Sequence, residues 1–336
     1  MGSTLPVVVT YEDRPSALDG AEMMVRSLHR HSPDVEIRVY SPLSAVADRL
    51  RDVSTFRWIP TDDLVGQGWN IKPRVLTRAL GLAARCCWLD TDIIVLRDIR
   101  PTLLSVPSDA VAVGEEYHLP GEPGGRLRCE AHGMKCGRSL AHGVNSGSTV
   151  FARCHLDLLD AWSDALASSA YQEAQQQPVS QRPMAFVGDQ DVLWAALVSE
   201  RFSDLAVMYF RTGLVVTPHC GANGYHVVDR LRDLTGSKAV FTHMLGSYKP
   251  WSFASFPDWY RQPRDYFHLV CYELSPFFEA GRAYASHLSH PVWLTRRTLP
   301  AKILSTISLG CVPIQGMPLA LAAWAAAGVK GFASGR

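Results

Sequence analysis

Short β-branched or apolar runs alternate with helical patterns along most of the chain, and this alternation constrains the fold more than any other feature. Strands are predicted at 7–10, 35–40, 57–60, 144–152, 205–210 and 239–242. Helices are predicted at 21–29, 45–50, 73–85, 155–167 and 191–199. Because strands separated by helices join through crossover connections, the pattern predicts an α/β fold whose central sheet is mainly parallel and flanked by helices.

One segment is too apolar to be an edge strand. Residues 86–96 read Cys-Cys-Trp-Leu-Asp-Thr-Asp-Ile-Ile-Val-Leu, and they predict one central strand that Asp90 and Asp92 interrupt. Two ionised carboxylates in apolar surroundings are unfavourable unless a cation neutralises them. Mg²⁺ or Mn²⁺ suits such a pair and commonly completes its coordination with phosphate oxygens. An Asp-x-Asp alone is a weak signal, so a solvated or capping pair remains the alternative.

A second polar cluster, Thr-His-Met-Leu-Gly-Ser-Tyr-Lys-Pro-Trp at 242–251, directly follows an apolar strand. His243 offers an imidazole ligand, Gly246 lets the backbone approach an anion, and Lys249 supplies a positive charge for phosphate. The alternative is a structural histidine on a loop beside an exposed lysine. Taken together with the two aspartates, the cluster favours a site for a metal ion and a phosphate.

Four motifs in this order resemble the retaining glycosyltransferases of family 8, which include glycogenin and bacterial lipopolysaccharide galactosyltransferases. They are Leu-Asp-Thr-Asp at 89–92, Asn-Ser-Gly at 145–147, Asp-Gln-Asp at 189–191 and His-x-x-Gly-x-x-Lys-Pro-Trp at 243–251. The resemblance covers residues 7–251. It implies the GT-A fold and a nucleotide-diphosphate sugar as donor, and it favours UDP as the nucleotide. It also implies transfer of a hexose with retention of configuration.

The resemblance also implies which residues hold the donor. Asp90, Asp92 and His243 would bind Mn²⁺ or Mg²⁺ on the donor diphosphate, with Thr91 between the two carboxylates in the same binding group. Gly246 and Lys249 would contact that diphosphate. Thr10 and Tyr11 would contact the base and ribose at the carboxyl end of the first strand, with assistance from Asp19 or Gly20.

Further residues are assigned by the resemblance to the transferred sugar. Lys72 or Arg74 would reach the sugar or a phosphate, and a helix-terminus charge is the alternative for each. Asn145 and Ser146 would contact the donor, and Asp189 and Gln190 are the candidate catalytic residues. A covalent intermediate and an oxocarbenium-like ion pair both remain open. The ion pair is favoured because Gln190 is a poor nucleophile and a carboxylate such as Asp189 readily stabilises positive charge.

Charge and composition exclude some functions and leave others. With 33 Lys plus Arg against 32 Asp plus Glu, the net charge of +1 lacks the basic excess of a nucleic-acid-binding protein. A sugar nucleotidyltransferase remains an alternative, although a Gly-rich basic loop is missing after the first strand. A nucleotide-sugar-binding or carbohydrate-binding protein without transferase activity is the other. The acceptor can be a glycan, a lipid-linked molecule or a small molecule.

The segment from Tyr117 to Gly143 predicts a long loop, interpreted as a mobile lid on the acceptor side. Its cysteines and histidines match no common zinc module. The N-terminus has no basic region and too short an apolar run for a signal peptide, so we expect a cytoplasmic protein whose eight cysteines are free thiols.

The C-terminal part is set apart by a stretch without charge. We expect a catalytic domain at 1–260 and a helical appendix at 261–336. From Ile303 to Val329 there are 27 residues with no charged side chain, and prolines and glycines divide them into pieces of about ten. Basic residues precede the run, so peripheral contact through 296–329 with the inner face of a membrane is one interpretation. A packed appendix or a homo-oligomer contact is the other.

Overall fold

The computed structural model describes residues 5–64, 68–120, 123–221, 224–246, 249, 251 and 262–334. The chain forms two compact units. The first unit comprises Met1–Asp13, Pro33–Asp90 and Ile99–Thr212, and the second comprises Arg14–Ser32, Thr91–Asp98 and Gly213–Arg336. The domain boundary predicted between residues 260 and 261 lies outside the described residues.

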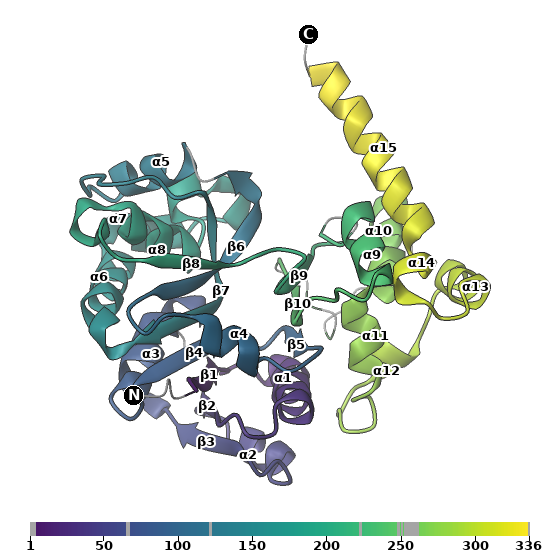
Figure 1. Ribbon diagram of the computed structural model, residues 1–336, viewed down its shortest axis with the longest axis horizontal. Helices are drawn as coiled ribbons and strands as arrows, with labels where there is room; N and C mark the ends of the chain where they lie inside the picture. The colour runs from purple at the N-terminus through teal and green to yellow at the C-terminus, as the bar shows by residue number, and fades with distance from the viewer. Residues whose placement is uncertain are drawn as a thin grey trace. The chain divides into compact units, whose positions relative to one another are not determined.

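The first unit is built on a seven-stranded sheet (Figure 1). Its strands are β1 (Val7–Tyr11), β2 (Ile37–Ser41), β3 (Phe56–Pro60), β4 (Arg85–Leu89), β6 (Val111–Pro120), β7 (His142–Ala152) and β8 (Val207–Phe210). Their order is β3-β2-β1-β4-β7-β6-β8. The strands run parallel from β3 to β4, antiparallel on both sides of β7, and parallel again between β6 and β8.

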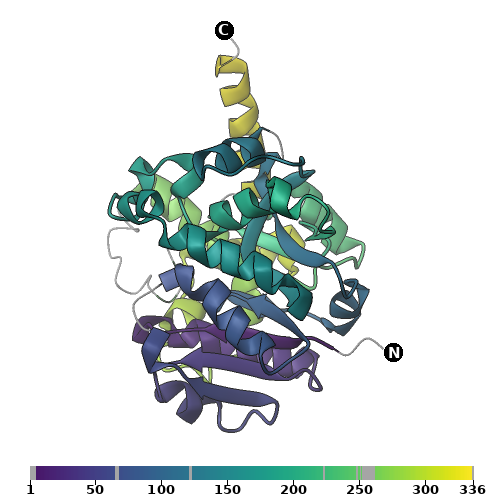
Figure 2. The ribbon, with the colours of Figure 1, turned by 90° about the vertical axis from the view of Figure 1, so that its left-hand side faces the viewer.

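In the first unit, helices pack against the sheet and against one another (Figures 1 and 2). They include α3 (Lys72–Leu80) against β1 and β4, α8 (Asp189–Val198) against β7, and α6 (Leu156–Ala167) against both helices. Trp162, Tyr171 and Trp194 are among the largest fully buried side chains of this core. Shorter helices are α2 (Ala45–Leu50), α4 (Arg100–Ser105) and α7 (Ser169–Gln175). The predicted α/β class with a mainly parallel sheet is confirmed.

The second unit contains a three-stranded sheet of β5 (Ile93–Val95), β10 (Phe241–Met244) and β9 (Val216–His219). Strand β10 is antiparallel to β5 and parallel to β9. Helix α1 (Leu18–His31) lies beside β5, where the Val95 amide donates a 3.0 Å hydrogen bond to the Ser27 hydroxyl. Helices follow at α9 (Val227–Leu234), α10 (Pro263–Glu273), α11 (Pro276–Arg282) and α12 (Val292–Thr295). Phe277, Phe278 and Leu294 are fully buried in this core.

The prediction of one continuous strand over 86–96 is wrong. Strand β4 ends at Leu89, β5 begins at Ile93, and the two belong to different sheets. All residues of both strands are buried, so hydrophobicity alone does not separate them. The chain leaves the first sheet at Asp90-Thr91-Asp92, since β4 pairs with β1 and β7 while β5 pairs with β10.

The predicted loop at 117–143 is also wrong in part, because β6 continues to Pro120 and helix α5 (Gly124–Ala131) follows. Helix α5 packs on α8. The Arg128 guanidinium makes a buried 2.7 Å ion pair with Asp191 and stacks over the Trp194 ring at 4.2 Å. A Cβ on Gly125 would lie 2.8 Å from the Trp194 indole nitrogen. The residues that α5 contacts are distant from it in the sequence, so local composition could not predict the helix.

Two predicted helix lengths also need correction. The helix predicted at 73–85 ends at Leu80, and Leu82 is exposed, because the chain turns at Gly81. Helices α13 (Leu299–Ile307) and α14 (Val312–Gln315) are short as predicted, with left-handed backbone at Leu309 and Gly310 between them. Helix α15 (Met317–Ser334) is longer than predicted, because Pro318 lies in its first turn, where proline is tolerated.

All eight cysteines are free thiols, as predicted. Within the described ranges, no helix is both long enough and apolar enough to cross a membrane.

Candidate active site

In the first unit, the end of β4, the middle of β7 and the starts of α3 and α8 bring together three of the four sequence motifs. Their central group is the Lys72 ammonium, which is 5% exposed. Its Nζ lies 3.1 Å from Asp90 Oδ1 and 3.3 Å from Asp189 Oδ2, and it donates a 3.0 Å hydrogen bond to Ser146 Oγ. One buried cation thus connects residues that are far apart in the sequence.

The surroundings of Lys72 keep it charged. Burial alone would lower the pKa of Lys72, but the carboxylates of Asp189 and Asp90 outweigh burial and raise it above its usual value. The ammonium also lies 5.8 Å from the centre of the Trp88 ring. Trp88 Nε1 in turn donates a 2.7 Å hydrogen bond to Asp90 Oδ1. Trp88 therefore contacts both members of the Lys72–Asp90 ion pair.

Asp189 is the most enclosed carboxylate of this cluster. Its Oδ2 accepts a 2.7 Å hydrogen bond from the Ser146 hydroxyl, and its backbone carbonyl accepts one of 2.9 Å from the Trp162 indole. Burial raises the pKa of Asp189, against the lowering effects of Lys72 and Ser146. Asp189 is therefore held in one position by three side chains from three different elements.

Asn145 and Gln190 lie next to this cluster. Asn145 Nδ2 donates to Gln190 Oε1 at 3.2 Å and to Glu116 Oε2 at 3.1 Å, while Asn145 Oδ1 accepts from the Gly147 amide at 2.9 Å. Sequence reasoning did not identify Glu116 or Trp88. A signal for Trp88 exists, because it directly precedes Leu89 and Asp90 in the first motif. Glu116 has no such signal, since its role comes from the pairing of β6 with β7.

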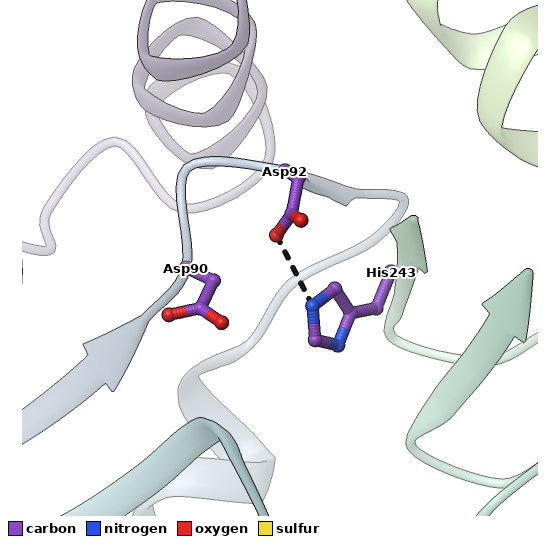
Figure 3. Close-up of side chains that lie close together, drawn as sticks. All are labelled: Asp90, Asp92 and His243. Atoms are coloured by element: carbon purple, nitrogen blue, oxygen red, sulfur yellow. Dashed lines mark ion pairs between the residues drawn. The ribbon is translucent and has the colours of Figure 1, made fainter. Parts of the chain in front are cut away.

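In the second unit, Asp92 is buried and lies between His243 and Lys249. Its Oδ1 is 3.1 Å from His243 Nε2, and its Oδ2 pairs with the Lys249 ammonium. Lys249 also donates a 2.8 Å hydrogen bond to the Met244 carbonyl. Figure 3 shows the Asp92 and His243 side chains pointing toward each other from the turn before β5 and from β10. Burial would raise the pKa of Asp92, but Lys249 and His243 lower it strongly.

Close packing against α1 fixes the turn at Thr91 and Asp92. A Cβ on Gly20 in α1 would lie 2.5 Å from the Trp251 ring and 2.8 Å from the Thr91 carbonyl oxygen. Glycine is therefore required where the last residue of the fourth motif packs beside the Asp-x-Asp turn. Asp19 and Thr91 are buried in the same unit, and Gly246 has a left-handed φ of +87°.

The remaining predicted residues are placed differently. Arg74 is on the exposed side of α3, whereas Lys72 points inward. Thr10 is fully buried on β1, and its hydroxyl has no hydrogen-bond partner among the residues that the structure describes. Tyr11 is 7% exposed, and its hydroxyl donates a 2.8 Å hydrogen bond to the Leu64 carbonyl. Residues 247, 248 and 250 of the fourth motif lie outside the described residues.

Comparisons with known proteins were made for sequence and for structure. No protein-family model matches the chain. No curated protein matches it either. Solved structures that resemble it include the bifunctional glycosyltransferase WbbM, with 14% identity, a TM-score of 0.47 and 75% of this chain covered. The chain spans 47% of the length of WbbM, so about half of that protein has no counterpart here.

Two further solved structures also resemble the chain. The galactosyltransferase LgtC, in complex with donor and acceptor sugar analogues, has 17% identity and a TM-score of 0.45, and covers 84% of this chain and 99% of its own. Mouse xyloside xylosyltransferase 1 has 13% identity and a TM-score of 0.43, and covers 71% and 97%. All three are glycosyltransferases, the class of enzyme that the sequence motifs resemble.

Proposed function

We propose that this protein is a metal-dependent glycosyltransferase that moves a hexose from a nucleotide-diphosphate sugar to an acceptor hydroxyl with retention of configuration. The observation that carries the proposal is the buried ammonium of Lys72 between Asp90, Asp189 and the Ser146 hydroxyl. A sheet needs no such cluster for stability, because burying the charged groups of Lys72 and Asp189 is unfavourable. The same cluster is well suited to polar recognition of a donor sugar.

The donor set also suits a divalent cation. Asp90, Asp92 and His243 offer two carboxylates and an imidazole, a combination that Mn²⁺ and Mg²⁺ accept. Asp92 Oδ1 is buried and, within the described part of the chain, makes no hydrogen bond, although it forms a 3.1 Å ion pair with His243 Nε2. Such an oxygen is an available ligand atom, so these residues fit a metal ion. When bound, the ion would neutralise charge on the diphosphate leaving group.

The residues of this chain then have distinct roles. Lys249 and Gly246 would hold the diphosphate, a UDP group by resemblance. Asn145 and Gln190 would exchange their mutual hydrogen bond for bonds to sugar hydroxyls. Lys72 would hold the Asp90 and Asp189 carboxyl groups in place while substrate binds.

The bond changes of the reaction are these. The bond between the anomeric carbon and the diphosphate oxygen breaks, and its electron pair leaves with the nucleotide diphosphate. The acceptor oxygen bonds to the anomeric carbon on the same face, and its proton passes to a leaving phosphate oxygen. We propose the ion-pair route, since Asp189 Oδ2 already contacts Ser146 and Lys72 and is a weakened nucleophile. Its charge would stabilise the cationic sugar.

A thermal-shift screen tests this function directly. UDP-, GDP- and TDP-sugars are added with and without Mn²⁺, and a metal-dependent rise in Tm is expected for a UDP-sugar. The positive donor is then incubated without acceptor, and release of the nucleotide diphosphate is measured. A carbohydrate-binding protein would bind the sugar without this release. A sugar nucleotidyltransferase would instead convert the nucleotide-diphosphate sugar and added pyrophosphate into a nucleoside triphosphate and a sugar 1-phosphate. Absence of both binding and hydrolysis for every donor would refute the proposal.

A further inference from the structure

The C-terminal helices of the second unit expose an unusual number of large apolar side chains. In α13, Leu299, Ile303 and Ile307 are 69%, 49% and 75% exposed. They are four residues apart and therefore share one face of the helix. The opposite face packs inward through Ala301, which is fully buried with Val270 and Leu274 of α10 and the turn that follows it. Helix α13 is thus held in place with an apolar stripe facing solvent.

Further large apolar side chains are exposed after α13 in the sequence. Leu309, in the turn after the helix, is 94% exposed. In α15, Leu319 still packs against the core around Val270, but Leu321 and Trp324 are 47% and 73% exposed. Exposed apolar residues are normal when they are scattered singly, whereas a gathered set marks a surface that is covered by something else. We call Leu299, Ile303 and Ile307, together with Leu309 directly after the helix, the C-terminal apolar surface.

The distribution of charged residues around these helices indicates which kind of partner covers this surface. Glu279 is the last acidic residue of the chain. Residues 280–336 contain six basic side chains and no carboxylate, which leaves 27 basic against 32 acidic residues in 1–279. Lys302 is exposed in α13, between Leu299 and Ile303, and Arg296 is exposed just before the helix. The basic groups therefore accompany the apolar stripe, while the rest of the chain is acidic.

A second copy of this chain is a poor match for such a surface. A two-fold dimer through it would bring each Lys302 toward its own counterpart and would provide no carboxylate in 280–336 to compensate. An anionic lipid surface has the opposite charge and an apolar interior to receive leucine and isoleucine side chains. We propose that the C-terminal apolar surface docks on the surface of an anionic membrane. This partner lies beyond the proposed transfer reaction and does not depend on it.

The experiment measures binding of the full chain to lipid vesicles by co-sedimentation. Vesicles are made of phosphatidylcholine alone or of phosphatidylcholine mixed with phosphatidylglycerol. We expect binding to the mixed vesicles, weaker binding at high salt, and little binding to phosphatidylcholine alone. The triple variant Leu299→Ser, Ile303→Ser, Ile307→Ser should bind the mixed vesicles at least about tenfold more weakly.

A matched control separates this surface from general hydrophobicity. The variant Leu82→Ser, Leu104→Ser, Val179→Ser removes three side chains of the first unit that are 66%, 47% and 49% exposed. It should bind as the wild type does. Lys302→Glu should weaken binding about fivefold or more, since each basic residue near the surface contributes to attraction. Circular dichroism of each variant verifies that the helices are retained.

Three outcomes would overturn the proposal. One is equal binding by both triple variants, and another is no binding to vesicles of either composition. The third is a dimer in light scattering that the α13 variant alone abolishes, since a second copy would then cover the surface. Nucleotide-sugar hydrolysis needs no vesicles, so failure here leaves the proposed reaction intact, and failure of hydrolysis leaves this proposal intact.

Discussion

Asp189 Oδ2 accepts a 2.7 Å hydrogen bond from Ser146 Oγ. This bond connects a residue of β7 with a residue at the start of α8, 43 positions apart in the sequence. Both side chains are buried. Since Lys72 contacts the same two groups, removal of any member leaves charged or polar atoms without compensation. This connection makes the first unit's part of the site sensitive to single substitutions.

Ser146→Ala should lower both stability and activity. The Asp189 carboxylate would lose its hydroxyl donor, and we expect a loss of about 1–3 kcal/mol in unfolding free energy. Urea denaturation measures this loss, and initial rates of donor hydrolysis should fall at least about tenfold. The matched control is Ser199→Ala, which removes a buried hydroxyl bonded to the Ala196 carbonyl outside the site. Equal rates for both variants would contradict a role for Ser146 in the reaction.

Lys72 and Arg74 should behave very differently. Lys72→Met leaves the buried Asp189 and the half-buried Asp90 without their cation, so we expect about 3–5 kcal/mol of destabilisation and loss of activity. Arg74→Met changes an exposed side chain and should keep stability within about 0.5 kcal/mol of the wild type. Thermal unfolding and hydrolysis rates are measured for both. A large loss of activity in Arg74→Met alone would reverse the assignment between the two.

Lys249→Met should strengthen metal binding while it weakens donor binding. In the second unit the Lys249 ammonium pairs with Asp92, and it would compete with a cation for that carboxylate. Titration with Mn²⁺, followed by calorimetry without donor, should give a lower Kd for this variant, whereas Asp92→Asn should abolish binding. Chelation of the metal should stop hydrolysis in the wild type. Asp160→Asn, an exposed carboxylate of α6, serves as the control that leaves the titration unchanged.

Gly20→Ala should be destabilising because its Cβ would lie 2.5 Å from the Trp251 ring and 2.8 Å from the Thr91 carbonyl. Overpacking of this kind costs about 1–3 kcal/mol, and the displaced Thr91 turn should reduce metal affinity as well. Gly188→Ala is the control, since nothing lies within 4 Å of its added Cβ and its extended backbone suits any residue. Comparable unfolding midpoints for the two variants would disprove the packing argument.

His155 should make stability depend on pH. Its Nδ1 accepts a 3.0 Å hydrogen bond from the Ala152 amide and therefore requires an unprotonated nitrogen, while its Nε2 lies 3.1 Å from the Asp109 carbonyl. Burial lowers the pKa of His155 below its ordinary value of 6.5. Below pH 6.5 the unfolded chain takes up a proton that the folded chain does not, so stability falls by at most about 1.4 kcal/mol per pH unit.

The variant His155→Gln isolates that contribution. Urea denaturation between pH 5 and 8 should show the wild type losing stability relative to the variant as the pH falls through 6.5. The difference should be constant above that value. Parallel profiles over the whole range would show that His155 titrates normally in the folded protein.

Periodicity predicted the first unit well because its strands and helices have regular patterns and lie next to each other in sequence order. Residues 37–41 and 56–60, for example, form strands close to where alternation placed them. The predicted strand at 86–96 failed because hydrophobicity reports burial and not which sheet a strand joins. Strand β9 and helix α9 were not predicted, since the pattern at 216–234 is weak and includes Pro218 within the strand.

The site was predictable to the extent that its residues are adjacent in short motifs. Asp90, Ser146 and Asp189 each belong to such a motif, and the structure brings them together around Lys72. Lys72 and Arg74 could not be told apart by sequence, because their difference is the direction that each side chain takes from α3. Contacts made across the sheet, such as Glu116 with Asn145, carry no sequence signal at all.

The break between β4 and β5 has a geometric consequence for the two aspartates. Consecutive Cα atoms are 3.8 Å apart, so the Cα atoms of Asp90 and Asp92 can never separate by more than about 7.6 Å, whatever the sheets on either side do. The covalent tripeptide would therefore act as a chelating arm in the proposed metal site: once one carboxylate held a cation, the other would be present at a high effective concentration. Inserting a single residue beside Thr91 would lengthen that arm and should weaken the chelate without altering either sheet.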